Sequence, residues 1–334
     1  TYTKILCYYV QVTIFHGTFR VKPIVIRLAC GWTHPPGEGH GEKSSGTPEL
    51  FSYPFFEGRS DVAVIDNPTL QVLNNRVSLR VYDQREISQE TLDVILEAMM
   101  RAPTAGNQML YSVIVVRDQK TKEILAQTCD HQAFIATAPV ILIFLADHQR
   151  WFDYYRLNGV AEYCDREGLQ FEAPQESDLL LAIEDAMIAA QNAVIAAESM
   201  GIGSCYIGDI VENYEVHREL FDLPDWAFPI GMLCLGYYRE NHLKKLRDRF
   251  DKQYIVFDEK YKHLTEEEYR QMFAQEEKRY HPDNPYRADN FAQAFYARKT
   301  GAAFSKEMAR SVRVAMKQWD GRLLNAKVSN KKDS

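Results

Sequence analysis

The chain has 334 residues, 46% of them hydrophobic and 25% charged, which is enough for one large hydrophobic core or two smaller ones. Its formal net charge of −7 and pI of about 5.8 argue against a nucleic-acid-binding protein, which usually carries a basic surface. The six cysteines are scattered and include no Cys-x-x-Cys pair, so the sequence predicts neither a disulfide framework nor a zinc knuckle, and a cytoplasmic location is expected.

The first 64 residues are expected to form an appendage outside the fold. The apolar stretch ILCYYVQVTIF (5–15) imitates the core of a signal peptide, but no small-residue cleavage site follows it. Residues 30–49 are rich in Gly, Pro and Ser, which is typical of a linker. The alternative is a native extension that packs on the folded part of the chain.

Regular patterns begin near Asp66 and mix helices with strands. Apolar residues at helical spacing predict helices over 67–76, 88–103, 119–128, 178–200, 289–299 and 305–319, and a further helix that starts after Thr265. Apolar runs predict strands over 111–118, 139–147, 230–238 and 253–258, after an extended segment at 78–83. Because the elements do not alternate steadily, the pattern favours an α+β fold over a doubly wound parallel one.

The helix expected over 178–200 is apolar nearly all round. A helix of that kind is buried, either against its own sheet or against another subunit. It carries two acidic and two amide residues near its middle, so no membrane-spanning segment is expected. Gly201 is predicted to end this helix.

Two clusters of basic residues suggest a phosphate site. Arg76, Ser78 and Arg80 alternate along an extended segment, so they share one face. Two guanidinium groups that flank a hydroxyl on one face suit a phosphate. Arg247 and Arg249 repeat the alternation farther along the chain. The phosphate hypothesis gains if the clusters meet in space; otherwise the first is a solvated strand edge and the second a charged loop.

Three other patterns do not predict a functional site. The stretch GIGSCYIGD (201–209) imitates a dinucleotide-binding glycine motif, but its last spacing is wrong and it follows a helix, so cap and turn roles are expected. Cys129 and His131 lie two apart in a loop, a spacing that rarely makes a working nucleophile pair. The nine histidines are dispersed without helix-face spacing, so no metal site is predicted.

Six stretches, taken in order, resemble the flavin-dependent nitroreductase family. They are NRVSLRVYD (75–83), RAPTAGNQML (101–110), CDHQAFIATAPVILIFLAD (129–147), LAIEDAMIAAQNAVIAAESMGIGSCYIGDI (181–210), LPDWAFPIGMLCLGYY (223–238) and RFDKQYIVFDEKY (249–261). The resemblance covers about residues 67–320. Within the family, the chain looks most like the group of the major oxygen-insensitive nitroreductase, whose members carry a long C-terminal extension.

The resemblance implies a nitroreductase-like α+β fold, with a central mixed or antiparallel sheet flanked by helices. It also implies an intertwined homodimer that binds FMN at its interface. The implied organisation is an FMN-binding core over 65–262 and a C-terminal helical extension over 263–334. The expected partners are a second copy of the chain and small-molecule electron acceptors, with no nucleic acid and no membrane.

The same resemblance implies roles for individual residues. Those expected to hold the FMN phosphate are Arg76, Ser78 and Arg80, with Arg247 and Arg249 on the other side and Lys245 as an alternative to them. Those expected along the ribityl chain and the ring are Thr104, Asn107, Gln108, Gln132, Tyr206, Ile207, Gly208 and Asp209. No side chain is expected to be catalytic, because FMN carries the chemistry.

The implied activity is that of an FMN-dependent NAD(P)H oxidoreductase, which reduces nitroaromatic or quinone-like acceptors by ping-pong hydride transfer through flavin N5. An NAD(P)H-dependent flavin or quinone reductase is the alternative within this class. Alternatives from other classes are a flavin-binding protein without turnover and a cysteine hydrolase that uses Cys129 or Cys205. The physiological acceptor and the preference between NADH and NADPH stay open.

The chain departs from common family patterns at three places, one of which is the Lys-x-Arg pairing near 247, which is not exact here. Gln108, Met109 and Leu110 replace a common Gln-Pro-Trp form, so the substrate side of the site is expected to differ. The stretch 76–78 reads Arg-Val-Ser instead of a common Arg-Arg-Ser start, which removes one positive charge.

Overall fold

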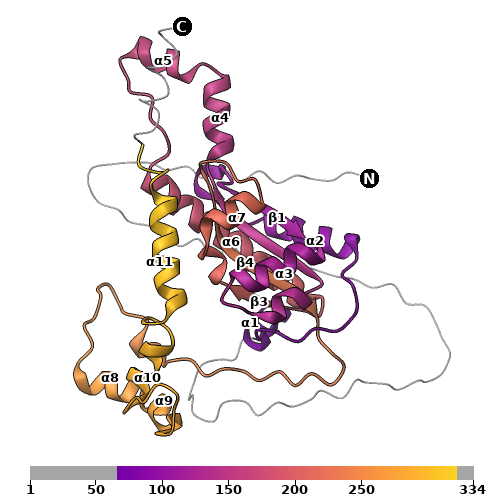
Figure 1. Cartoon of the computed structure of the whole chain (residues 1–334), viewed down its shortest axis with the longest axis vertical. Helices are drawn as coiled ribbons and strands as arrows, with labels where there is room; N and C mark the ends of the chain where they lie inside the picture. Colours follow the sequence, from indigo (N-terminus) through magenta and orange to yellow (C-terminus); the bar gives the residue numbers. More distant parts are fainter. Residues whose placement is uncertain (1–65, 322–334) are drawn as a thin grey trace, which may run out of the picture. The chain divides into compact units, whose positions relative to one another are not determined.

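The computed structural model of the chain describes residues 66–321, and the appendage expected over 1–64 lies outside them. Within these residues the centre is a four-stranded antiparallel sheet with the strand order β1-β2-β4-β3 (Figure 1). The strands are β1 (Tyr111–Val116), β2 (Val140–Asp147), β3 (Ile202–Ile207) and β4 (Ala227–Tyr237). The expected α+β class, with an antiparallel sheet flanked by helices, is confirmed.

Each face of the sheet is covered by its own layer of helices (Figure 1). The continuous apolar run of β2 points alternate side chains to opposite faces, so both faces can be buried. On one face, Leu142 and Phe144 pack with α2 (Gln89–Met100) and α6 (Glu176–Ser199). On the other, Ile141 and Ile143 pack with α3 (Gln119–Thr128) and with the short 3-10 turns η2 (Ala133–Thr137) and η3 (Asp209–Val211).

Helix α6 buries one face only. Its small residues, among them Ala189 and Ala193, lie against the sheet and are fully buried. Its other face exposes Leu180, Leu181, Met187 and Ile188. The expected burial of this helix against its own sheet is therefore confirmed, and packing of its exposed face against another subunit stays a prediction. By length and composition alone α6 could cross a membrane, but its packing on the sheet is that of a core helix.

The caps read from the sequence begin the helices as expected. Ser88 accepts the Thr91 N–H at the start of α2, and Thr265 and Glu268 form the capping box of α8 (Glu266–Met272). Helices α1 (Pro68–Asn75), α10 (Phe291–Arg298) and α11 (Ala303–Met316) lie where helices were expected. Four short helices were not predicted: α4 (Gln149–Leu157), α5 (Val160–Glu167), α7 (Tyr214–Leu220) and α9 (Ala274–Arg279).

The strand expected over 253–258 is wrong. Lys252–Tyr254 form a 3-10 turn, η4, and the apolar residues after it are solvent-exposed, with Ile255 at 58% and Val256 at 55%. Strand propensity reflects how well a side chain fits a pleated, half-buried surface. In the part of the chain that the structure describes, this run has no neighbouring strand to supply such a surface.

The C-terminal helices contact the core through α11. Ala315 and Trp319 are buried in a cluster with Phe152 and Trp226. The Trp226 indole N–H also donates to a backbone carbonyl just after α11 at 2.7 Å. Helices α8, α9 and α10 bury no residue. A division of the chain at 262/263 stays a prediction.

Candidate functional site

Two segments that are far apart in the sequence line one basic cavity. The cavity has a volume of about 430 Å³. It is lined by Arg76, Val77, Ser78 and Arg80 from the first segment and by His242, Leu243, Lys245, Arg247 and Arg249 from the second. The two basic clusters therefore meet in space, which is the condition that the phosphate hypothesis sets. We call this space the basic cavity.

Pairing with β3 fixes the face that the first segment presents. Ser78 forms a parallel bridge with Ser204 of β3, and the Leu79 N–H donates to the Ser204 carbonyl at 2.9 Å. Leu79 is fully buried, so Ser78 and Arg80 on either side of it face the cavity. Gly203 permits this close approach, because a Cβ there would lie 2.6 Å from Cδ2 of Leu79. The glycine run therefore serves packing.

Among residues 66–321, no acid neutralises the positive charges of the basic cavity. No carboxylate among residues 66–321 forms an ion pair with Arg76, Arg80, Lys245, Arg247 or Arg249. The Arg80 guanidinium packs over the ring of Phe134 instead, 5.8 Å from its centroid. Like charges repel, so such a group favours a bound anion. Guanidinium forks around a hydroxyl are suited to a phosphate.

Gln132 and Asp209 form a hydrogen-bonded pair close to the basic cavity. The Gln132 Nε2 donates to Oδ2 of Asp209 at 2.8 Å and to the Cys129 carbonyl at 3.1 Å. Both N–H groups of the amide are then in use, so its oxygen is the atom that can meet a ligand, as an acceptor. The pair lies close to the basic cavity, because Phe134, two residues after Gln132, contacts Arg80.

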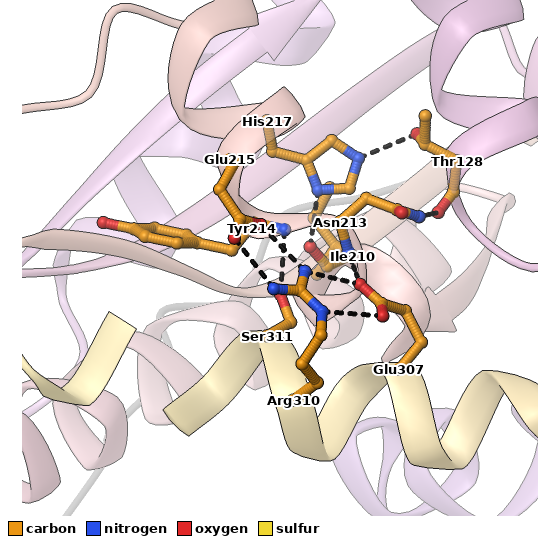
Figure 2. A network of polar contacts seen from close by, with 9 residues as sticks. All are labelled: Thr128, Ile210, Asn213, Tyr214, Glu215, His217, Glu307, Arg310 and Ser311. Carbon is orange, nitrogen blue, oxygen red and sulfur yellow. Dashed lines mark hydrogen bonds and ion pairs between the residues drawn. The ribbon is translucent and has the colours of Figure 1, made fainter. Parts of the chain in front are cut away.

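Helix α11 contacts the segment that follows Asp209 through a polar network (Figure 2). The Asn213 amide donates to the Thr128 carbonyl at 2.8 Å, and the Asn213 N–H donates to Glu307 of α11 at 3.2 Å. The Tyr214 N–H donates to the Ser311 hydroxyl at 2.8 Å. These contacts fix the chain on both sides of the pair, after Asp209 and before Gln132. Helix α11 therefore contacts the chain at Asn213 and Tyr214, shortly after Asp209.

The end of β3 contributes backbone more than side chains. Ile207 is 2% exposed and points into the core, so only its backbone can face a ligand. Tyr206 is half-buried, and its hydroxyl donates to Gln191 at 3.4 Å. Gly208 has a φ of −78°, and a Cβ there would meet no atom within 4 Å. The fold alone does not require glycine at 208, which fits close approach by a ligand.

Residues 104–110, which we call the polar loop, have an unusual backbone. Gly106, Asn107 and Met109 have φ angles of 56°, 58° and 52°. Asn107 and Met109 are not glycine, so this conformation costs them free energy and persists only where surrounding contacts hold it. The side chain of Asp185 accepts the N–H of Ala105 at 2.8 Å and that of Leu110 at 3.1 Å.

Helix α4 holds the polar loop from its other side. Arg150 donates to the carbonyls of Met109 at 2.7 Å and Tyr111 at 2.8 Å, and the Trp151 indole donates to the Gln108 carbonyl at 2.8 Å. Beside the loop lies a second cavity of about 840 Å³, lined mainly by apolar and aromatic side chains. The loop is therefore held by hydrogen bonds from α6 and α4 and lies next to an apolar surface.

The polar loop and the basic cavity lie at diagonally opposite corners of the sheet. Tyr111, directly after the loop, pairs with Ala146, whereas Ser204, the partner of Ser78, is level with Val140, six residues away. Ser78 also lies four steps across the sheet from β1. At about 3.4 Å per residue and about 4.8 Å per strand, the separation is about 20 Å along the strands and about 19 Å across them.

The structure thus divides the expected site residues into two groups. One group surrounds or adjoins the basic cavity: Arg76, Ser78, Arg80, Gln132, Tyr206, Ile207, Gly208, Asp209, Arg247 and Arg249, together with the alternative Lys245. Thr104, Asn107 and Gln108 form the other group, in the polar loop. Within one chain the two groups do not meet.

The cysteine hypothesis has no support in the geometry. Cys129 and Cys205 are fully buried, and burial raises the pKa of both thiols. His131 directs its Nδ1 to the Gln127 side chain at 3.1 Å. A buried, protonated thiol without a histidine partner is a poor nucleophile.

Sequence patterns missed the residues that hold the site in place. Asp185, Arg150 and Trp151 fix the polar loop, yet none was predicted to do so. Asp185 left one signal, because it is a charged residue within an apolar helix and is 2% exposed in the fold. Its partners could not be read from the sequence, since they lie 75 and 80 residues away.

Comparison with known proteins shows similarity over the sheet and its covering helices. Residues 73–237 match the sequence model described as "Nitroreductase family". The chain is 30% identical to "FMN reductase [NAD(P)H]" of Bacillus subtilis (strain 168) over 181 residues, which are 54% of this chain and 70% of the relative.

Two examples illustrate the similarity in fold to solved structures. The structure of NfrA2 of B. megaterium has a TM-score of 0.63 at 26% identity, and the match covers 76% of this chain and 98% of that one. A putative oxidoreductase from Bacteroides fragilis NCTC 9343 has a TM-score of 0.62 at 29% identity, with 74% and 98% covered. The similarity therefore extends over nearly the whole of both solved chains.

Proposed function

This chain belongs to the nitroreductase family, and on that premise we propose that it holds FMN by its phosphate in the basic cavity and reduces nitroaromatic or quinone-like acceptors with NAD(P)H in a ping-pong order. It is an NAD(P)H-dependent flavin oxidoreductase. The observation that carries the proposal is the group of five cations around Ser78 without a carboxylate partner among residues 66–321. FMN, when bound, supplies two-electron hydride transfer between the nicotinamide and the acceptor.

The residues of the basic cavity fit the FMN phosphate. Arg76 and Arg80 offer guanidinium forks on both sides of the Ser78 hydroxyl, and Lys245, Arg247 and Arg249 add positive charge from the second segment. The oxygen of Gln132 is placed to accept a hydrogen bond from an N–H or O–H of the cofactor, because its amide nitrogen is already in use. Backbone N–H groups near Gly208 are suited to stabilise negative charge on the reduced ring.

We further propose a homodimer in which a second copy completes each FMN site. The ribityl chain that joins phosphate to ring is much shorter than the diagonal of the sheet, so one chain cannot offer both groups of residues to one FMN. A polar loop from the partner copy would bring Thr104, Asn107 and Gln108 to the ring. The exposed apolar residues of α6 are a surface for such a partner. The apolar cavity beside the loop would then border the acceptor, and apolar contact alone selects poorly among flat acceptors.

The visible spectrum of the purified chain tests the proposal. The chain should bind FMN, become yellow and lose that colour when NADPH or NADH is added without oxygen. Return of the colour on addition of a nitroaromatic, a quinone or free FMN identifies the acceptor class. A protein that takes up no flavin contradicts the proposal, and one whose bound flavin NAD(P)H does not bleach supports a flavin-binding protein without turnover.

The variant R76A/R80A tests the phosphate assignment. Each replacement removes charge-assisted hydrogen bonds to the phosphate, so FMN affinity should fall about a hundredfold or more. Affinity for riboflavin, which has no phosphate, should change little. K120A is a control for loss of one exposed positive charge outside the cavity. Unchanged FMN affinity in R76A/R80A refutes the assignment.

A further inference from the structure

The second segment of the basic cavity has neither helix nor strand, yet it keeps one face toward the cavity. Every second residue from Leu243 to Arg249 lines the cavity. Lys244, which lies between two of them, forms an ion pair with Glu198 of α6. Successive side chains of an extended chain point to opposite sides, so contacts on one side decide which residues occupy the other. The side that faces away from the cavity is therefore the side that sets its geometry.

Glu198 anchors this outer side in the core. Its side chain is 3% exposed, and the Tyr238 hydroxyl donates to both of its oxygens, at 3.1 and 2.9 Å. The Lys244 ammonium also lies 4.5 Å from the centroid of the Tyr238 ring, so a carboxylate and a ring face hold it together. The other outer pair, Asp248 with Arg279, is more than 60% exposed on both sides and adds little rigidity.

The negative charge of Glu198 is electrostatically unfavourable for anion binding in the nearby basic cavity. A carboxylate near a phosphate cavity lowers the local positive potential, and burying it has a desolvation cost. The presence of Glu198 is explained if it fixes the geometry of the basic cavity. Lys244 and Lys245 are neighbours of the same type, but the first faces Glu198 and the second lines the cavity.

We propose that Glu198 is the positioning residue of the basic cavity: by holding Lys244, it turns Lys245, Arg247 and Arg249 toward the FMN phosphate. This rests on the proposed FMN binding. Of the two adjacent lysines, Lys244 fastens the segment and Lys245 contacts the ligand. A buried carboxylate that does not line the basic cavity thereby controls the selectivity for FMN over riboflavin.

The test compares dissociation constants for FMN and riboflavin, measured by flavin fluorescence with the full-length chain. E198Q and K244M should each weaken FMN about tenfold or more and leave riboflavin within about twofold, because only FMN carries the phosphate. K244R should retain most of the FMN affinity, since Arg keeps the ion pair and packs on the Tyr238 ring. If Glu198 acted only through its charge, E198Q would tighten FMN binding, so the sign of this change is decisive.

A double-mutant cycle separates the two lysines. In the E198Q background K244M should cause little further loss, whereas K245M should weaken FMN further, because it removes a direct contact. A parallel loss of FMN and riboflavin affinity, together with a lower melting temperature, would mean a merely structural role and overturn the inference. So would an unchanged ratio of the two affinities in K244M. A wild-type chain that binds neither flavin refutes the proposed function itself.

Discussion

Replacing Asp185 with Asn should loosen the polar loop. Asp185 is 2% exposed, and its two oxygens accept the N–H groups of Ala105 and Leu110, at 2.8 and 3.1 Å. These two bonds fasten both ends of a segment in which Asn107 and Met109 have positive φ angles. A loop with this backbone conformation depends on such fastening, because its unrestrained residues favour other conformations.

The size of the effect follows from the two bonds. An amide oxygen can accept one of the two N–H groups, but the amide NH₂ is itself a donor and faces the other. One hydrogen bond to a charged group, worth about 1.5–3 kcal/mol, is lost, and a buried N–H is left unpaired at a cost of about 1–3 kcal/mol. We expect D185N to lower the free energy of unfolding by about 3 kcal/mol.

Urea unfolding followed by circular dichroism measures this loss, at one fixed protein concentration and without added flavin. The matched control is E184Q, a change of the same kind at the adjacent, exposed residue of α6, which should stay within about 0.5 kcal/mol of wild type. If D185N also stays within about 0.5 kcal/mol, Asp185 does not hold the loop and the reasoning is refuted.

Three further predictions concern other parts of the site. G203A should lower the free energy of unfolding by about 1–3 kcal/mol, because its Cβ would lie under 3.0 Å from the side chains of Leu79 and Tyr238. G208A should leave stability unchanged and weaken FMN binding, and equal destabilisation by the two variants would contradict this. Desolvation, with nearby carboxylates, raises the pKa of Glu212 from 4.5 to about 7, so the folded chain binds more protons than the unfolded chain between these values. The stability of the wild type relative to E212Q, measured in urea, should therefore fall as pH rises through this range and level off above it. The comparison with E212Q cancels the opposite contribution of His217, because burial lowers the pKa of its imidazole. A relative stability that rises with pH there would contradict the assignment. S311A should cost about 1–2 kcal/mol, because its buried hydroxyl accepts an N–H at the start of α7 (Figure 2). R310A should cost less than S311A, because the ion pairs of Arg310 are exposed to solvent, and the reverse order would contradict this prediction.

Local patterns predicted the elements that local physics decides. The β2 strand followed from an apolar run, and the cap at Ser88 from a residue type that satisfies free N–H groups. The shared face of Arg76, Ser78 and Arg80 followed from the alternation of an extended chain. The first half of the basic cavity could therefore be predicted from sequence.

Other features depend on contacts between distant residues. The stretch 253–258 has the composition of a strand but no sheet to join among the described residues, so its pattern misled. The different tasks of Lys244 and Lys245 depend on Glu198, which lies 46 residues away from Lys244. Nor does any local pattern show that the polar loop and the basic cavity lie at opposite corners of the sheet, because strand order decides this.

In the proposed homodimer, each FMN site takes the basic cavity of one copy and the polar loop of the other. Co-expression of R76A/R80A with N107A/Q108A, each with its own affinity tag, yields a mixed dimer that can be isolated through both tags. The measurement is the content of NAD(P)H-reducible FMN in this dimer. The account predicts half occupancy, because one of its two sites combines an intact cavity with an intact loop. A mixed dimer without flavin, beside a wild-type dimer that is fully loaded, would contradict the claim, since both groups of residues would then come from the same chain.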